Sequence, residues 1–277
     1  MKVFISADIE GVAGFSTFDA GGPKDFEWER ARRWMTDEVV VAARAALAAG
    51  AAEVIVADSH GNAQNILVEA LPERVRLVRG WPRPLLQMQG VEEPGVEAAV
   101  LIGYHGSTHA PSGTLCHTYF GWRAIRLNGV TISESYGNAA LAGAFGVPVV
   151  AISGDEAAVA ETRAWLPEIE AAIVKRAYGW RSVITTGPAE AHRLIADAVT
   201  RGIQRRTALA PLVLPGPITV ELEFNNRIMV EIMELMPQFQ RMDPYTIRYV
   251  AADMVEAMRF IVFTQFMGKT HDPRYTG

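Results

Sequence analysis

The chain has 277 residues, of which 49% are apolar and 21% are charged, and its net charge at pH 7 is −5. This composition predicts a globular protein of one or two domains and excludes a disordered or fibrous chain. The negative charge argues against nucleic-acid partners. The longest apolar runs, such as residues 98–102, are far shorter than the roughly 20 residues that span a membrane, and the acidic Asp8 comes too early for a signal peptide.

Only one cysteine, Cys116, is present, so neither an internal disulfide nor a thiolate-rich metal site is expected. We therefore expect a soluble, cytoplasmic protein without a membrane partner.

Five short segments rich in Val and Ile have the pattern of strands that are buried on both faces. They are residues 3–7, 53–57, 75–78, 98–102 and 149–152. Segments with helical composition alternate with them, at residues 26–49, 63–71, 138–145 and 156–165. This alternation predicts an α/β fold of three layers with a mostly parallel sheet.

Two features depart from this alternation. Asn128-Gly129, between the β-like residues 123–127 and 130–133, predicts a hairpin. After a helix at residues 188–204, a proline cluster from Pro211 to Pro217 predicts a boundary. We expect a catalytic α/β domain at residues 1–210 and a smaller α+β domain at residues 211–277. Its expected elements are a strand at 218–224, a helix at 227–235, a strand at 246–250 and a helix at 252–265.

Acidic and imidazole side chains follow three of the expected parallel strands. Asp8 and Glu10 follow the first strand, His60 follows the second, and His105 follows the strand at 98–102. Ligands bind at the carboxyl ends of such strands because the loops converge there. The sequence therefore predicts one functional site at this edge of the sheet.

The residue types at this edge are those of a metal site. Asp8 and Glu10, two residues apart at a strand end, point to one side and repel each other unless a proton or a cation lies between them. With His60 and His105 they offer the ligands that suit zinc and its neighbours. Taken singly, each has a simpler explanation as a turn cap or a hydrogen-bonded loop residue. Glu134 is a fifth candidate, although an acid there also complements a helix N-terminus.

Five such ligands exceed the three that a catalytic zinc site usually takes. They suit a dinuclear centre with a bridging carboxylate and metals about 3.5–4 Å apart. Such a pair lowers the pKa of bridging water and polarises a carbonyl or phosphoryl oxygen.

The remaining histidines and the cysteine are less informative. His117 is a sixth ligand, a general acid/base or a surface histidine, and His109 on the same loop is expected to be solvated. His192 and His271 receive no role. Cys116 and His117 point opposite ways in an extended segment, so they form no catalytic dyad. The chain also lacks a Gly-x-Ser-x-Gly elbow, a dinucleotide-binding glycine motif and a Walker motif.

In chain order, these motifs resemble the D-aminopeptidase family of dinuclear zinc peptidases, which in bacteria is associated with dipeptide transport. The resemblance rests on Ser6-Ala7-Asp8-Ile9-Glu10-Gly11, Asp58-Ser59-His60, Gly103-Tyr104-His105, Cys116-His117-Thr118 and Ser133-Glu134 with Gly137-Asn138. It covers nearly the whole chain and weakens after about Pro211.

The resemblance implies a metal-dependent aminopeptidase that removes N-terminal D-amino acids, typically D-Ala, from short peptides. It implies two zinc ions per chain, with other divalent metals as alternatives, held by residues that match Asp8, Glu10, His60, His105 and Glu134. Asp8 is the implied bridge. A catalytic role falls on the residue that matches His117. The family also implies a homodecamer whose active sites face an internal chamber.

Other readings remain open from the residues. A dinuclear phosphoesterase would need several basic residues near the metals, and the motifs have only Lys24, Arg30, Arg79 and Arg123 nearby. A non-enzymatic peptide-binding protein on the same fold is the third reading. Lys175 is either an oxyanion or carboxylate partner or a solvated helix lysine. Seven of the ten methionines follow Pro217, so we expect this part to carry some of the oligomer interface, although core packing explains most of them.

Overall fold

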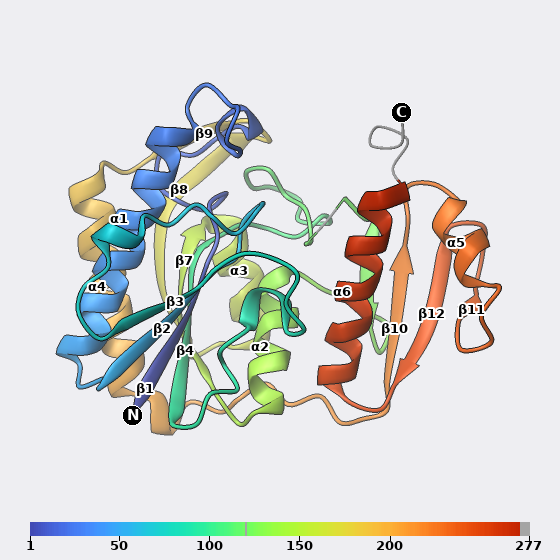
Figure 1. Cartoon of the computed structure of the whole chain (residues 1–277). Coiled ribbons are helices and arrows are strands. Elements are labelled where there is room, and N and C mark those ends of the chain that lie inside the picture. The colour runs from blue at the N-terminus through green and yellow to red at the C-terminus, as the bar shows by residue number, and fades with distance from the viewer. Residues whose placement is uncertain (120, 272–277) are drawn as a thin grey trace.

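A computed structural model describes residues 1–119 and 121–271, with side chains as far as residue 267 (Figure 1). Within this part, seven strands form the larger sheet, in the order β3-β2-β1-β4-β7-β8-β9. All neighbours in this sheet are parallel except β8 and β9. The strands are β1 (Lys2–Ala7), β2 (Glu53–Asp58), β3 (Val75–Val78), β4 (Val96–Tyr104), β7 (Val149–Asp155), β8 (Glu170–Gly179) and β9 (Ser182–Thr185).

Helices cover both faces of the larger sheet, which confirms the predicted three-layer α/β architecture (Figure 1). On one face lie α1 (Trp28–Ala48) and α4 (Pro188–Gln204), and on the other lie α2 (Glu134–Ala144) and α3 (Glu156–Trp165). Alternate residues of β1 are divided between these two layers. Val3 and Ile5 pack with the residues of α1 and α4, whereas Phe4 packs with those of α2.

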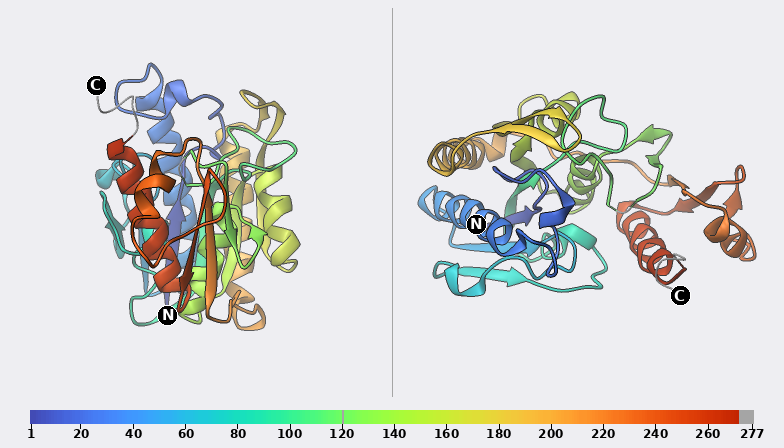
Figure 2. Two further views of the ribbon diagram at one scale, coloured as in Figure 1. Left: turned by 90° about the vertical axis from the view of Figure 1, so that its right-hand side faces the viewer. Right: turned by 90° about the horizontal axis from the view of Figure 1, so that it is seen from above.

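The smaller sheet is antiparallel and has the order β11-β12-β10-β5-β6 in the described part of the chain. Its strands are β5 (Ala124–Leu127), β6 (Val130–Thr131), β10 (Ile218–Glu223), β11 (Gln240–Arg241) and β12 (Thr246–Ala251). The predicted hairpin joins β5 to β6 through Asn128 and Gly129, which both have positive φ angles. The other helices are α5 (Ile228–Met233) and α6 (Met254–His271), and α6 lies between the smaller sheet and α2 (Figure 2).

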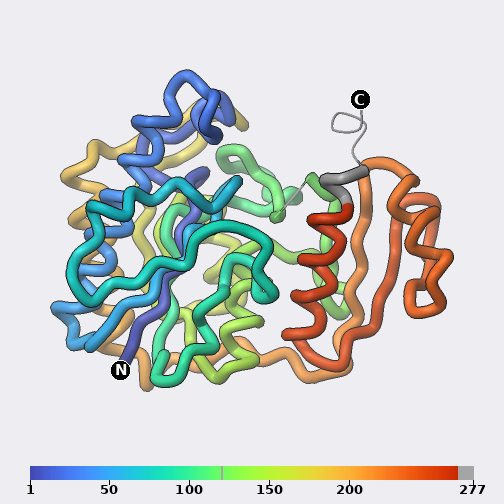
Figure 3. Tube along the Cα trace, in the orientation of Figure 1, coloured from blue at the N-terminus to red at the C-terminus, as the bar shows by residue number. Residues whose placement is uncertain are grey.

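The smaller sheet takes strands from both sides of residue 210, because β5 and β6 precede this position and β10 follows it. The smaller sheet thus contains strands from both predicted domains, and the division into domains at residues 1–210 and 211–277 stays a prediction. Residues 272–277 of the second domain lie outside the described part. The tube in Figure 3 shows the chain leaving the larger sheet for β5 and β6 and returning to α2.

The predicted helix at residues 63–71 is wrong. Only the 3-10 turn Val68–Ala70 forms there. The Asp58 carboxylate accepts the backbone N–H groups of Asn65 and Ile66, and Ala63 has a φ of 55°. The N–H groups of Asn65 and Ile66 therefore donate to a side chain and not to the carbonyls of a helix, and the segment forms a loop after His60.

Strands β8 and β9 were not predicted, because Lys175 and Arg176 interrupt the apolar pattern of β8. The reading of Lys175 as a solvated helix lysine is wrong, since it is a buried residue of strand β8. Among the described residues, no helix combines the length and the apolar character that a membrane crossing requires.

Candidate metal centre

The acidic and imidazole residues gather where the strand order changes direction. From β1 the chain proceeds outward to β2 and β3, and then returns to place β4 on the other side of β1. Loops that follow β1 and β4 separate at such a point and leave room for a ligand. Asp8 and Glu10 follow β1, His60 follows β2, and His105 follows β4.

Two glycines let the loops that follow β1 and β4 approach closely. A Cβ atom on Gly11 would lie 2.0 Å from the Tyr104 carbonyl oxygen, and one on Gly103 would lie 2.3 Å from the Asp8 carbonyl oxygen. Gly103 also has a φ of +73°, which disfavours other residues. The glycines beside Glu10 and His105 therefore bring these side chains to one place.

The five predicted ligands meet in space. His60 Nδ1 lies 2.9 Å from Glu10 Oε2 and 3.4 Å from Asp8 Oδ1. His105 Nε2 lies 3.5 Å from Asp8 Oδ2 and 3.4 Å from Glu134 Oε1. The two oxygens of Asp8 thus face different histidines, which is the arrangement of a bridging carboxylate.

Glu134 enters this cluster from the first turn of α2. Ser133 is the N-cap, and its hydroxyl accepts the backbone N–H of Tyr136. Two donors hold the Glu134 carboxylate: Tyr119 N–H donates to Oε1 at 2.6 Å, and Gln87 Nε2 donates to Oε2 at 2.5 Å. The structure places Glu134 where both the hairpin prediction and the helix prediction put it, at the junction of the two.

One nitrogen of each imidazole faces a main-chain carbonyl. His60 Nε2 lies 2.8 Å from Gly21 O, His105 Nδ1 lies 2.9 Å from Gly106 O, and His117 Nδ1 lies 2.8 Å from Leu115 O. A neutral imidazole that donates to these carbonyls presents the lone pair of its other nitrogen to the carboxylates. Carbonyl partners of this kind orient metal-binding histidines in proteins.

The charges of this cluster are strongly coupled. Burial and the neighbouring Glu10 raise the pKa of Asp8 to about 6. Burial also raises the pKa of Glu10, but His60 and the other histidines outweigh this effect and hold the pKa well below its ordinary value. Burial lowers the pKa of His105, but Glu134 and Asp8 outweigh it and place the pKa well above the ordinary value. Carboxylates and imidazoles in this cluster therefore each favour the charged form of the other, which is an environment that also favours a cation.

The donor set fits a metal ion. His105 Nε2 is buried and has no hydrogen-bond partner in the described part of the chain, although two carboxylate oxygens lie nearby. Three groups of ligand atoms lie within 4.8 Å of one another. They are Asp8 with Glu10 and His60, Asp8 with His105 and Glu134, and Glu10 with His105 and His117. Asp8, Glu10 and His105 each belong to two of these groups, so the groups overlap in a single cluster that offers ligands to a metal.

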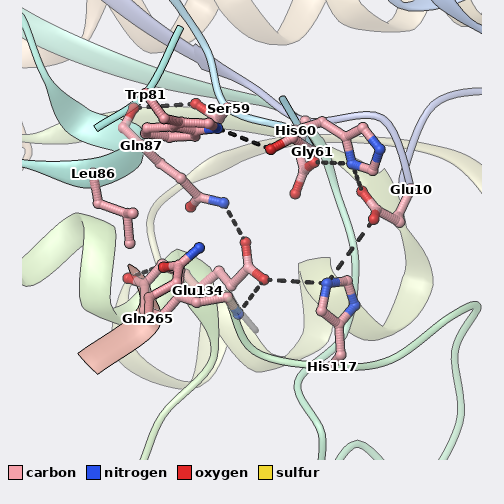
Figure 4. Close-up of a pocket in the computed structure, with 12 residues that line it drawn as sticks. Glu10, Ser59, His60, Gly61, Trp81, Leu86, Gln87, His117, Glu134 and Gln265 are labelled. Atoms are coloured by element: carbon pink, nitrogen blue, oxygen red, sulfur yellow. Dashed lines mark hydrogen bonds and ion pairs between the residues drawn. The ribbon is translucent and has the colours of Figure 1, made fainter. Parts of the chain in front are cut away.

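His117 lies at the rim of the cluster. Its Nε2 is 3.9 Å from Glu10 Oε1 and 3.7 Å from Glu134 Oε1, farther than the contacts of His60 and His105 (Figure 4). The ring stacks on His105, with centroids 4.2 Å apart, and the edge of Phe18 contacts it. His117 is also a quarter exposed, so it can reach a ligand in the cavity.

The cluster forms the floor of a cavity of about 180 Å³ (Figure 4). Among the described residues, its walls contain three carboxylates and neither lysine nor arginine. The complete lining is Asp8, Glu10, Ser59, His60, Gly61, Trp81, Leu86, Gln87, His117, Tyr119, Glu134 and Gln265. A phosphoester site usually has basic residues beside its metals, and the described walls contain none.

Sequence reasoning missed the residues that hold the cluster in place. Lys175 on β8 is buried, and its Nζ donates to the main-chain carbonyls of Glu10, Val12 and Phe15. Gln87, Tyr119 and the cavity residues Trp81 and Gln265 were also missed. The one available signal was Lys175 directly after the apolar residues 171–174, because a buried ammonium must find acceptors.

The other candidates lie apart from the cluster. His109 is exposed, and His192 lies on α4. His271 ends α6, where side chains are not described. Burial raises the pKa of the Cys116 thiol to about 11, which makes it a poor nucleophile.

An α/β sheet with buried carboxylates and imidazoles at its change of strand direction defines a metal-dependent enzyme. Comparisons with known proteins identify which kind. Residues 1–263 match the model of peptidase family M55, described as D-aminopeptidase. A D-aminopeptidase of Bacillus subtilis (strain 168) is 31% identical over 275 residues, which cover 98% of this chain and 99% of that protein.

A solved structure has the same fold, with a TM-score of 0.91 and 28% identity, over 96% of this chain and 98% of that chain. It is described as the Zn-dependent D-aminopeptidase DppA from Bacillus subtilis, a self-compartmentalizing protease. The chain therefore belongs to the D-aminopeptidase family. It is a metallopeptidase, an enzyme of the hydrolase class.

Proposed function

We propose that this protein is a zinc-dependent aminopeptidase that removes N-terminal D-amino acids of the D-Ala type from short peptides. Two zinc ions per chain are held by Asp8, Glu10, His60, His105 and Glu134. The observation that carries this proposal is the position of Asp8, whose two oxygens face His60 on one side and His105 on the other. When bound, a pair of divalent ions polarises a carbonyl oxygen and makes water a stronger nucleophile.

His117 is the proposed catalytic residue. Its Nδ1 donates to Leu115 O, so Nε2 is the nitrogen that faces the cavity and exchanges protons with the reacting groups. As a general base it accepts a proton from the attacking water, and as a general acid it returns the proton to the leaving amine. The stacked ring of His105 and the edge of Phe18 fix its orientation.

The composition of the cavity walls favours a peptidase over a phosphoesterase. Asp8, Glu10 and Glu134 are proposed metal ligands, so bound cations would offset their negative charge. Among the described residues, the walls contain neither lysine nor arginine, the side chains that commonly bind a phosphate group, which weakens the phosphoesterase reading. The small volume of the cavity favours short peptides, since it leaves little room beyond a few residues.

The test combines metal analysis with a comparison of substrates. The purified protein is loaded with zinc, its zinc content is measured by elemental analysis, and hydrolysis of D-Ala-D-Ala, L-Ala-L-Ala and nitrophenyl phosphate is followed. We expect two zinc ions per chain and rapid cleavage of the D-dipeptide alone. Preferential cleavage of nitrophenyl phosphate would establish the phosphoesterase instead, and binding of peptides without cleavage of any would establish a binding protein.

We also propose that the protein assembles into a homo-oligomer, a decamer with an internal chamber. The similarity to a self-compartmentalizing protease supports this proposal. The C-terminal part offers apolar surface for subunit contacts: Leu235 is 79% exposed and Met236 is 51% exposed. By contrast, Met229, Met233, Met254 and Met258 are buried and belong to the core. The cytoplasm is the proposed location, in keeping with the free thiol of Cys116.

A further inference from the structure

One wall of the cavity comes from the C-terminal part of the chain. Gln265 lies on α6, and its side chain reaches into the cavity beside Gln87 and Glu134 (Figure 4). Only 7% of Gln265 is exposed. The helix that packs on the smaller sheet therefore contributes a buried polar group to a site whose proposed metal ligands all follow strands of the larger sheet or begin α2.

Gln265 differs from the other polar groups of this cavity because its amide oxygen has no partner. Its Oε1 is buried without a hydrogen bond to any of the residues that the structure describes. Gln87, by comparison, donates to Glu134, and Trp81 Nε1 donates to Gly61 O. A buried amide oxygen without a partner is destabilising, so its presence in the wall of a ligand cavity points to a hydrogen bond that the ligand completes.

The chemistry of the amide indicates which part of a peptide it contacts. A glutamine offers N–H donors and a carbonyl acceptor, which are complementary to a main-chain peptide group. A free ammonium, which has donors only, would use no more than the carbonyl. In Figure 4, Gln265, Trp81 and Leu86 lie on one side of the cavity, and Glu10, His60 and His117 lie on the other. Because the proposed catalytic residue His117 belongs to the second group, the proposed function puts the scissile bond on that side and Gln265 beside the chain beyond it.

We propose that Gln265 is a specificity-determining residue that hydrogen-bonds the first peptide group beyond the scissile bond. This inference rests on the proposed aminopeptidase activity. It predicts that the enzyme favours tripeptides over substrates that have no peptide group at this position. Trp81 forms the adjacent wall. Its ring is held by a hydrogen bond to Gly61 O and by the Arg83 guanidinium, which lies 3.7 Å from the ring centroid.

The test compares two substrates in the zinc-loaded enzyme. D-Ala-Gly-Gly has a peptide group beyond the scissile bond, whereas D-alaninamide has none. We expect Gln265→Met to lower kcat/KM for the tripeptide about tenfold, mostly through KM, since one hydrogen bond to the bound substrate is lost. Hydrolysis of D-alaninamide should stay unchanged. Because the buried amide oxygen of Gln265 has no partner to lose, Gln265→Met should unfold at the same or a higher temperature than the wild type.

Equilibrium binding gives a second readout. An analogue of D-Ala-Gly-Gly with a methylene in place of the scissile carbonyl keeps the distal peptide group, and calorimetry should show about tenfold weaker binding to Gln265→Met. Gln265→Ala serves as an independent variant. Thr264→Val is the matched control on α6, because in the described part of the chain the Thr264 hydroxyl donates to carbonyls of its own helix, and this change should alter the hydrolysis of neither substrate.

Equal losses on both substrates, or no loss on either, would overturn the role of Gln265. So would a fall in unfolding temperature that accompanies the loss of activity, since this would indicate a structural role. If the wild-type enzyme cleaved neither D-substrate, the aminopeptidase proposal itself would fail, and the two failures are therefore distinguishable.

Discussion

Single residues of the cluster are oriented by the main chain as much as by one another. His60, His105 and His117 each place one nitrogen against a backbone carbonyl, so the loops fix which nitrogen faces the carboxylates. Asp8 also accepts the backbone N–H of Ile9. The positions of these atoms therefore depend on loop geometry that short motifs alone do not specify.

Asp8 is the residue on which both proposed metal positions depend. Asp8→Asn should lose most of the metal from both positions, because two cations at close range then lack a shared negative charge. Elemental analysis after dialysis measures this loss. The exposed Asp37→Asn on α1 is the control and should retain its metal. Two metals per chain in Asp8→Asn would refute the bridging role.

His117 is expected to act in catalysis rather than as a ligand. His117→Ala should keep both metals and lower kcat about 10²–10⁴-fold, the usual contribution of a general acid or base. His109→Ala, on the same loop but exposed, should leave kcat unchanged. Loss of metal from His117→Ala would make His117 a ligand, and an unchanged kcat would leave it without a catalytic role.

At the scale of elements, β8 determines the shape of the loop that follows β1. Lys175 reaches across from β8 to the carbonyls of Glu10, Val12 and Phe15. Burial lowers the pKa of this ammonium to about 8, against the pull of nearby carboxylates. A strand on the far side of β4 and β7 thereby holds the main chain on which Glu10 lies.

Lys175→Met should therefore weaken metal binding as well as stability. The carbonyls of Glu10 and Phe15 would lose their donor, at a cost of about 1–3 kcal/mol for each unpaired group, whereas the Val12 carbonyl would keep the backbone N–H of Phe15. Competition with a chelator measures the metal affinity, and thermal unfolding measures the stability. Arg176→Met, the exposed neighbour on the same strand, is the control. A lower unfolding temperature with unchanged metal affinity would limit Lys175 to a structural role.

The elements with a clear period were predictable from sequence, and those shaped by distant partners were not. The helices at Glu156–Trp165 and Pro188–Gln204 have the predicted bounds, because their apolar faces and first-turn residues are local signals. The segment from Ala63 to Leu71 was predicted as a helix because nothing local shows that Asp58 takes its backbone donors. Strand β8 was missed because its lysine is satisfied by carbonyls far away in the sequence.

The same distinction applies to the site. Asp8, Glu10, His60, His105 and Glu134 were predictable because each directly follows a strand or begins a helix, and the sheet brings such positions together. Gln265 was not, because α6 reaches the cavity only through the packing of the smaller sheet and α6 against α2. The residues around Gln265 in the sequence do not indicate how α6 packs against α2.

At the scale of the whole molecule, the C-terminal part offers surface for assembly. Exposed Ile232, Leu235 and Met236 lie on and just after α5, at the end farthest from the larger sheet (Figure 1). Light scattering at low micromolar concentration should report a large oligomer of about ten chains, consistent with closed symmetry. Leu235→Glu should reduce this mass, since a buried charge is unfavourable at an interface.

Val68→Glu provides the control for that change, since Val68 is an exposed apolar residue beside the larger sheet. Its mass should equal that of the wild type. A fully active wild-type monomer would contradict the proposed chamber and leave the metal centre unaffected.

The excursion of the chain through β5 and β6 has a consequence for the order of folding. The segment leaves the larger sheet after His117 and returns at Glu134, and its strand β5 pairs with β10, as in Leu127 with Val220. Pairing of segments so far apart in sequence is slow to form, because a long loop must close first. On the ribosome, β5 has no β10 to pair with until the C-terminal part has been synthesised. The segment that joins the proposed catalytic histidine to a proposed metal ligand is therefore expected to complete its pairing only when synthesis is nearly finished.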